Sequence, residues 1–555
     1  MKAPYLEDRN GQKVLIVDEA PFIMIAGEAH NSSASNVKFM ERIWERADEL
    51  NLNTVLLPIY WEIIEPEEGK YDFSLVDSII FQAREHRKKI GFLWFGSWKN
   101  AQCYYAPEWV KQDLKRFERA QLENGKNFKI LENVHGLHYS TLSAFCEETK
   151  KADAAAFARL MEHICGIDRI EHTVITMQVE NETGLLGEAR EHGERAEKMF
   201  ASSVPAPFLE YLKETYEELT PELASTIVRR EEVLYGKSWS EIFGEMADEV
   251  FQCYYTARFV EAVAKAGKKE YDLPMTVNCW LDKGQKPGKY LREDRVAKLM
   301  PIWKHAAPSI DIYGPDIYIP IFLKTCDCYT KGGNPLYIAE CATHSYAGIR
   351  ELYVIGHYHG MCYSPFGFED IGLPFTATQG ILFGMDTDDE LLKTPQNAEE
   401  YTKINGLLNG MMSLLAEAYG TRHLQASISE NGKNEVLSFA SYDFNIFYES
   451  RFLQTRSGAC LVLEQEENEF YVIVKDCGLD IRSTKVEVPY TDFLSVDEGY
   501  FSDGMFISEC RLNGDEITTM IFEGVHLLKI RVFSYANTLF LKEQRRQYKY
   551  EEKNG

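Results

Sequence analysis

The sequence lacks several features that would place it in other classes of protein. No stretch approaches the roughly 20 apolar residues that span a bilayer, and the first eight residues turn acidic without the apolar core of a signal peptide. Basic residues are scarce: 60 Lys and Arg stand against 86 Asp and Glu, a formal net charge of −26. Because nucleic-acid binding needs a basic surface, we expect no nucleic-acid partner. The missing apolar span and signal peptide lead us to expect no membrane partner and a cytoplasmic location.

Cysteine follows no regular spacing. The twelve cysteines are scattered along 555 residues, which in a long chain indicates reduced thiols rather than a disulfide framework. Cys326 and Cys328 form the one close pair, and neither a Cys-x-x-Cys motif nor a histidine cluster accompanies it. Since a closed zinc site needs four ligands, we expect no metal and no cofactor.

Short apolar runs alternate with amphipathic stretches from about residue 20 to residue 420, which is typical of βα units around a parallel sheet. Eight runs are candidate strands, at 22–27, 54–60, 90–95, 174–180, 275–280, 311–318, 335–340 and 360–365. The segment after Glu182 is too long for a plain connection and carries a helical pattern, with Gly267 as its expected C-terminal stop. The sequence therefore predicts an α/β fold, a (β/α)8 TIM barrel with a helical insertion at about 183–270.

The pattern changes to a period of two after about residue 420. Candidate strands lie at 435–440, 460–463, 470–474, 517–522 and 526–532. We therefore expect a catalytic barrel domain over residues 1–420 and an all-β sandwich domain over residues 421–555.

Two glutamates each end a strand-like run of the predicted barrel. Glu182 follows residues 174–181, and Glu340 follows residues 335–339. These positions suit the ends of strands four and seven, on the face where such barrels carry catalytic groups. Two carboxyl groups facing one cavity are what glycoside hydrolysis needs, one as proton donor and one to attack or stabilise the anomeric carbon. The structural alternatives are a salt bridge for Glu340 and a solvated helix start for Glu182.

Three motifs accompany these glutamates: Gly-Glu-Ala-His-Asn-Ser at 27–32, a Trp-x3-Glu-Pro-x2-Gly-x-Tyr-Asp-Phe run at 61–73, and Gln-Val-Glu-Asn-Glu at 178–182. With them the sequence resembles the retaining β-galactosidases of the clan-A glycoside hydrolases, in families 35 and 42 and their bacterial relatives with a C-terminal β domain. The resemblance implies that Glu182 is the acid/base and Glu340 the nucleophile. It also implies that Asn181 binds the sugar 2-hydroxyl and that a tyrosine, Tyr318 in preference to Tyr313, positions the nucleophile.

Further residues at predicted strand ends are candidates for sugar binding. Trp98 and Trp280 are candidates for stacking on a pyranose, with packing at the barrel rim as the alternative for each. His30, Glu62 and Glu369 are candidate hydroxyl ligands. The sequence departs from the animal-type family 35 pattern after strand three, where residues 96–100 lack the glutamate that helps bind galactose, so the identity of the sugar stays open.

These observations together predict a retaining exo-β-glycosidase, specifically a β-galactosidase that hydrolyses short oligosaccharides by double displacement. One alternative keeps the chemistry and changes the sugar to β-glucose, β-xylose or α-L-arabinopyranose. The other is a carbohydrate-binding barrel that has lost catalysis. The expected partner is a small oligosaccharide or glycoside, and a homo-oligomer is left open.

Overall fold

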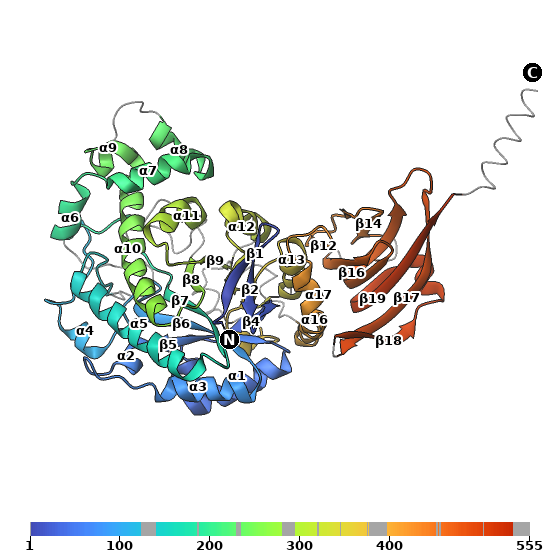
Figure 1. Cartoon of the computed structure of the whole chain (residues 1–555), viewed down its shortest axis with the longest axis horizontal. Coiled ribbons are helices and arrows are strands. Elements are labelled where there is room, and N and C mark those ends of the chain that lie inside the picture. The colour runs from blue at the N-terminus through green and yellow to red at the C-terminus, as the bar shows by residue number, and fades with distance from the viewer. Residues whose placement is uncertain are drawn as a thin grey trace, which may run out of the picture. The chain divides into compact units, whose positions relative to one another are not determined.

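The computed structural model of the chain (Figure 1) describes residues 2–123, 140–185, 188–228, 235–279, 295–318, 321–344, 346–374, 376, 397–450, 453, 457–502 and 504–536. They fall into two compact units, one of residues 1–344 and 361–395, the other of residues 345–360 and 396–555. In these described ranges no helix combines the length and the apolar character needed to cross a bilayer.

The first unit is built on a closed barrel of eight parallel strands (Figure 1). Around the barrel the order is β10, β11, β4, β5, β6, β7, β8, β9, so consecutive strands are neighbours. Their bounds are β4 Met24–Glu28, β5 Thr54–Tyr60, β6 Lys89–Lys99, β7 Val174–Asn181, β8 Met275–Cys279, β9 Ile312–Ile317, β10 Tyr337–Cys341 and β11 Cys362–Pro365. The predicted TIM barrel is confirmed, and every predicted barrel strand overlaps an observed one.

Helices follow these strands because the sequence supplies caps and apolar faces at helical spacing. In α1 (Val37–Glu49) the Asn36 side chain accepts hydrogen bonds from two backbone N–H groups, and Met40, Ile43 and Trp44 are buried. In the described part of the first unit, the other α-helices outside the β7–β8 segment are α2 Trp61–Ile64, α3 Ser74–Glu85, α4 Glu108–Gln112, α5 Glu147–Asp168, α11 Arg295–Ala306 and α12 Phe322–Tyr329.

The segment between β7 and β8, where the sequence predicts a helical insertion, contains α6 Glu194–Phe200, α7 Ala206–Glu214, α8 Pro221–Val228, α9 Trp239–Phe243 and α10 Ala247–Glu270. The expectation that Gly267 stops the last helix is wrong, because α10 continues to Glu270. A Cβ atom at Gly267 would lie 2.3 Å from the ring of Phe157 on α5. This glycine therefore serves the close packing of two helices rather than a helix end.

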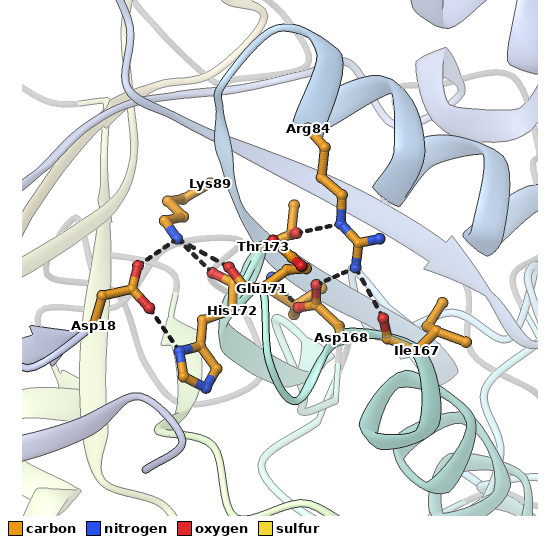
Figure 2. A network of polar contacts seen from close by, with 9 residues as sticks. Asp18, Arg84, Lys89, Ile167, Asp168, Glu171, His172 and Thr173 are labelled. Carbon is orange, nitrogen blue, oxygen red and sulfur yellow. Dashed lines mark hydrogen bonds and ion pairs between the residues drawn. The ribbon is translucent and has the colours of Figure 1, made fainter. Parts of the chain in front are cut away.

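A three-stranded antiparallel sheet precedes the barrel, formed by β1 Tyr5–Arg9, β2 Gln12–Val17 and β3 Ala20–Phe22. Asp18, in the turn between β2 and β3, lies 2.7 Å from His172 Nδ1 and accepts a 3.1 Å hydrogen bond from Lys89 Nζ (Figure 2). Beside it, Arg84 donates to Asp168 at 2.7 Å (Figure 2). The two contacts of Asp18 hold the small sheet against the barrel at the N-terminal ends of β6 and β7.

The second unit contains an antiparallel sheet with strand order β12, β15, β16, β19, β17, β18, and a β13–β14 hairpin that pairs with β16. The bounds are β12 Leu424–Ser429, β13 Glu435–Ser438, β14 Tyr442–Phe447, β15 Gly458–Glu466, β16 Glu469–Ser483, β17 Tyr490–Ser502, β18 Met505–Arg511 and β19 Ile521–Tyr535. Phe444 of the hairpin shares one core with Phe470 and Val472 of β16. The predicted all-β region at the C-terminal end is confirmed.

Helices α13 Ala347–His357, α16 Ala398–Gly410 and α17 Met412–Glu417 also lie in the second unit. The domain boundary near residue 420 stays a prediction. The predicted strand at 517–522 is wrong: Asp515–Thr519 forms the short helix α18, and β19 starts at Ile521. Two acidic residues in the first turn of α18, Asp515 and Glu516, favour the helical conformation at this point.

Candidate active site

Glu340 lies at the C-terminal end of the barrel, in β10, the seventh barrel strand, and is 3% exposed. Its Oε2 accepts a 2.5 Å hydrogen bond from the Tyr318 hydroxyl, and its Oε1 accepts a 3.2 Å bond from Asn278 Nδ2. Burial and the charge of Glu340 raise the pKa of Tyr318 well above its usual value, so its phenol keeps its proton and stays a donor. Two donors therefore fix this carboxylate in one orientation.

Glu182 follows β7, the fourth barrel strand, where the backbone turns sharply. Glu180 and Glu182 have φ values of 63° and 46°, a conformation uncommon for residues with a side chain. The Glu182 backbone N–H donates to Asn278 Oδ1 at 2.9 Å, which holds the turn against β8. The Glu182 side chain is buried, 5% exposed, and one of its carboxyl oxygens lies within 4.8 Å of one of Glu340.

Asn278 of β8 links three of the carboxyl-bearing strand ends. Its Oδ1 faces the Glu182 backbone, while its Nδ2 donates to Asp316 Oδ2 at 3.0 Å as well as to Glu340. Asp316 pairs with Glu340 across β9 and β10. Burial, then the charges of Glu340 and Glu182, raise the pKa of Asp316 well above its usual value.

Lys99, the last residue of β6, brings a positive charge to this cluster. It is 7% exposed. Burial alone would lower the pKa of Lys99, but the surrounding carboxylates, above all Glu340, raise it. The hydrogen bonds around Asn181 are best made when the oxygen and nitrogen of its side-chain amide are exchanged. In that orientation Asn181 Oδ1 accepts a 3.0 Å hydrogen bond from Lys99 Nζ. Lys99 thus holds the asparagine that precedes Glu182.

Glu28, at the end of β4, is fully buried, and neither of its carboxyl oxygens has a hydrogen-bond partner among the described residues. Burial and then the charge of Glu340 raise the pKa of Glu28 well above its usual value. A buried polar group without a partner in the protein is uncommon and needs an explanation. Glu340, Lys99, Glu182 and Glu369 are its electrostatic neighbours, so Glu28 belongs to the same group of charged side chains.

His30 and Glu369 come together at the mouths of β4 and β11. The His30 backbone N–H and the Ser33 hydroxyl both donate to Glu369 Oε1, at 3.0 and 2.7 Å. His30 Nε2 lies 2.8 Å from Asp370 Oδ2. The second carboxyl oxygen of Glu369, Oε2, is buried and has no hydrogen-bond partner in the described part of the chain. Of the two residues, Glu369 is the one that keeps an oxygen available for a hydroxyl group.

Two of the remaining candidate sugar ligands, Glu62 and Trp98, have contacts within the protein. Glu62 forms a 2.8 Å ion pair with Lys111 of α4. The Trp98 ring packs against Phe259 at 4.5 Å between ring centroids, and with 2% exposure it matches the alternative of packing at the barrel rim. Trp280 lies outside the described residues. Tyr313 is buried, and its hydroxyl has no partner among the described groups.

Three residues of the cluster escaped the sequence-based selection: Glu28, Lys99 and Asp316. For Asp316 a signal existed. Residues two apart in a strand point to the same face, so Asp316 shares the face of Tyr318, the predicted partner of Glu340. Glu28 follows the first predicted strand and belongs to the Gly-Glu-Ala-His-Asn-Ser motif, whereas Lys99 lies beyond the end of the third predicted strand and had no such signal.

Carboxyl groups at the ends of the fourth and seventh strands of a (β/α)8 barrel are the arrangement expected of a clan-A glycoside hydrolase. Comparison with protein families gives a closer relationship. Residues 31–245 match the model of glycoside hydrolase family 42, described as β-galactosidase. The chain is therefore β-galactosidase-like, which confirms the resemblance seen in its motifs. Residues 401–522 match a domain of unknown function, DUF5597.

Similar solved structures include three bacterial β-galactosidases. That of Rahnella sp. R3 is 16% identical over 72% of this chain and 57% of that one, with a TM-score of 0.43. That of Marinomonas ef1 is 13% identical over 74% and 63%, with a TM-score of 0.46. That of Bacillus circulans sp. alkalophilus is 12% identical over 92% and 99%, with a TM-score of 0.45. The chain thus spans less than two thirds of the first two proteins. No protein with a curated description matches it.

Proposed function

We propose that the protein is a retaining exo-β-galactosidase that releases terminal galactose from short oligosaccharides by double displacement. The observation that carries the proposal is the spacing of Glu182 and Glu340, whose nearest carboxyl oxygens lie within 4.8 Å. Retaining enzymes hold their two carboxyl groups about 5–5.5 Å apart, whereas inverting enzymes need roughly 6.5–9.5 Å to admit a water molecule. The spacing supports retention.

The hydrogen bonds around the pair support their division of roles. Tyr318 and Asn278 both donate to Glu340, which orients its carboxyl group as the nucleophile that attacks the anomeric carbon. Glu182 protonates the leaving oxygen in the first step and removes a proton from water in the second. Asn181, held between Lys99 and Glu182, is the proposed ligand of the 2-hydroxyl.

Galactose is the proposed sugar because the matched family is described as β-galactosidase. The buried Oε2 of Glu369 supports this choice, since it is an acceptor beside the barrel mouth that receives no hydrogen bond from the described residues. His30 and Glu62 are engaged by Asp370 and Lys111. Exo action follows from the family resemblance. The cytoplasmic location, metal independence and oligomeric state stay predictions. Activity that survives a chelator would support metal independence.

A mechanism-based trap tests the proposal. A 2-deoxy-2-fluoro β-galactoside should inactivate the enzyme and add one sugar to a peptide that contains Glu340, because the fluorine slows hydrolysis of the ester. The first product of an ordinary aryl β-galactoside should be β-galactose, observed by NMR before mutarotation. Glu340→Gln serves as the control and should take up no label. A first product with the α configuration, or label on another peptide, would refute the retaining mechanism or the nucleophile.

A further inference from the structure

Asp316 is a third buried carboxyl group beside the two proposed catalytic glutamates. It is 2% exposed and pairs in register with Glu340. One oxygen from each of Glu182, Asp316 and Glu340 lies within 4.8 Å of the other two. Double displacement uses two carboxyl groups, so it assigns Asp316 no part. Burying a third one at this distance is unfavourable unless it is neutral or has a specific partner.

The hydrogen bonds of Asp316 indicate where a proton lies. Its Oδ2 accepts from Asn278 Nδ2 at 3.0 Å, whereas its Oδ1 is buried and receives no hydrogen bond from a donor in the described residues. One oxygen of Asp316 lies within 4.8 Å of one of Glu182, and side-chain hydrogen bonding with Glu182 is among the causes that raise the pKa of Asp316. An ionised carboxylate is only an acceptor, so a bond between two carboxyl groups requires a proton on one of them. A proton on Asp316 Oδ1 satisfies both observations.

The charges around Asp316 favour this neutral form. The titratable groups that face it are Glu28 of β4, Lys99 of β6, Glu182 after β7, Tyr318 after β9 and Glu340 of β10. Burial first, and then Glu340 and Glu182, raise the pKa of Asp316 well above its usual value. With Glu340 ionised, Lys99 balances one negative charge, and the other buried carboxyl groups are most stable when they are neutral.

We propose that Asp316 is a positioning residue that stays protonated through the reaction and donates its Oδ1 hydrogen bond to Glu182. The inference rests on the proposed function, which makes Glu182 the acid/base. When Glu182 gives its proton to the leaving oxygen, the O–H group of Asp316 stabilises the carboxylate that remains. When Glu182 takes a proton from water, the same contact persists. No proton leaves Asp316 in either step, so the balance of protons is that of double displacement.

Two substitutions separate the hydrogen bond from the charge. Asp316→Asn keeps an acceptor for Asn278 and a donor for Glu182, but it cannot ionise. Asp316→Ala removes both. The readout is the alkaline limb of kcat/KM against pH on an aryl β-galactoside, which reports loss of the acid's proton in the free enzyme. We expect this limb to be unchanged in Asp316→Asn. In Asp316→Ala it should move upward by about one pH unit, because the Glu182 carboxylate loses a donor.

The value of kcat should also depend on whether residue 316 can donate a hydrogen bond to Glu182. Asp316→Ala should lower kcat about tenfold to a hundredfold for glycosides with poor leaving groups and much less for activated phenols, because the acid step is weakened. Asp316→Asn should keep most of the wild-type kcat on both substrates. If Asp316 were ionised instead, Asp316→Asn would remove a negative charge beside Glu182, and the alkaline limb would move downward. That shift, or an unmoved limb in Asp316→Ala, would overturn the proposal.

An infrared measurement does not depend on activity. The wild-type protein at neutral pH should show the carbonyl stretch of a protonated carboxyl group that is missing from Asp316→Asn, and thermal melting should show that the variant folds. If the two spectra do not differ in this band, Asp316 is ionised and the inference fails. A wild-type enzyme with no glycosidase activity would refute the proposed function instead, and the infrared band would still report the proton on Asp316.

Discussion

The two ends of the barrel both hold ionisable side chains, but they arrange them in opposite ways. At the N-terminal end, negative groups face positive ones: Asp18 contacts Lys89, and Asp168 contacts Arg84 (Figure 2). At the C-terminal end, buried carboxyl groups crowd around Lys99 and share its charge. Paired charges contribute to stability, whereas crowded like charges oppose it. Crowded carboxyl groups with shifted pKa values are typical of functional sites, so the comparison indicates that the C-terminal end of the barrel carries the active site.

The pKa shifts have opposite signs at the two ends. Partial burial works against ionisation of Asp18, but hydrogen bonds from His172 and Lys89 prevail and lower its pKa. At the other end, burial and neighbouring carboxylates raise the pKa of Glu28 and of Asp316. The raised pKa values keep these two carboxyl groups protonated at a higher pH, which limits the negative charge that surrounds Glu340. Substitutions at the two ends should therefore affect different properties of the protein.

The largest effect is expected at Glu340. Glu340→Gln should lower kcat at least about ten-thousandfold, because an amide cannot form the glycosyl ester. The same change removes a negative charge from the crowded end, so the melting temperature should stay the same or rise. Turnover of an aryl β-galactoside and thermal melting measure the two effects. Glu162→Gln on the exposed face of α5 is the control, with both properties kept. Residual activity within tenfold of wild type would show that Glu340 is not the nucleophile.

Glu182 should give a smaller loss that depends on the substrate. Glu182→Ala should slow hydrolysis about a thousandfold when the leaving group is poor, and much less when it is an activated phenol that needs no proton. Azide should then restore turnover and yield a β-glycosyl azide, because a small anion can enter the vacated space and needs no base. Mass spectrometry of the product measures this rescue. Equal loss on both substrates without an azide product would exclude Glu182 as the acid/base.

The choice of sugar is the next effect in size. An aryl β-galactoside should react about a hundredfold faster than the glucoside in kcat/KM, which corresponds to roughly 2.7 kcal/mol of differential transition-state binding. A site with a buried acceptor such as Glu369 Oε2 discriminates because that acceptor is left unpaired when the hydroxyl is misplaced. Glu369→Ala should reduce the ratio, while Glu162→Gln should keep it. Comparable turnover of the glucoside or xyloside would refute galactose specificity and leave the two-glutamate mechanism intact.

The sequence alone predicts those parts of the fold and the site that depend on local pattern. The β5 strand is one such part: Thr54–Tyr60 is a continuous buried run of β-forming residues, and it was predicted with its observed bounds. Glu182 and Glu340 could be selected because each ends a strand, and barrel strands share one catalytic face. Tyr318 could be preferred to Tyr313 because it lies nearer the strand end.

The rest depends on contacts that no local pattern contains. Asp316 lies opposite Glu340 only because of the register between β9 and β10. Trp98 turns onto Phe259, which belongs to a helix far along the chain. Glu62 is held by Lys111 of α4. In each case the sequence gives the residue type and the strand end, while tertiary packing decides which side chain enters the site.

The smallest effect is expected at Asp18, which tests the role of the paired charges at the N-terminal end of the barrel. The lowered pKa of Asp18 means that its contribution to stability is present above its ordinary pKa and is lost as the pH falls through the lower value of the folded state. Because the side chain is 44% exposed, solvent screens the pair, and Asp18→Asn should reduce the free energy of unfolding by no more than about 1 kcal/mol at neutral pH. The difference from wild type should shrink below about pH 4. Denaturant unfolding at several pH values measures it, with Glu19→Gln in the same turn as the control and kcat unchanged in both variants. A difference that persists at low pH, or a loss of kcat in Asp18→Asn, would show that the two ends of the barrel are not separated in this way.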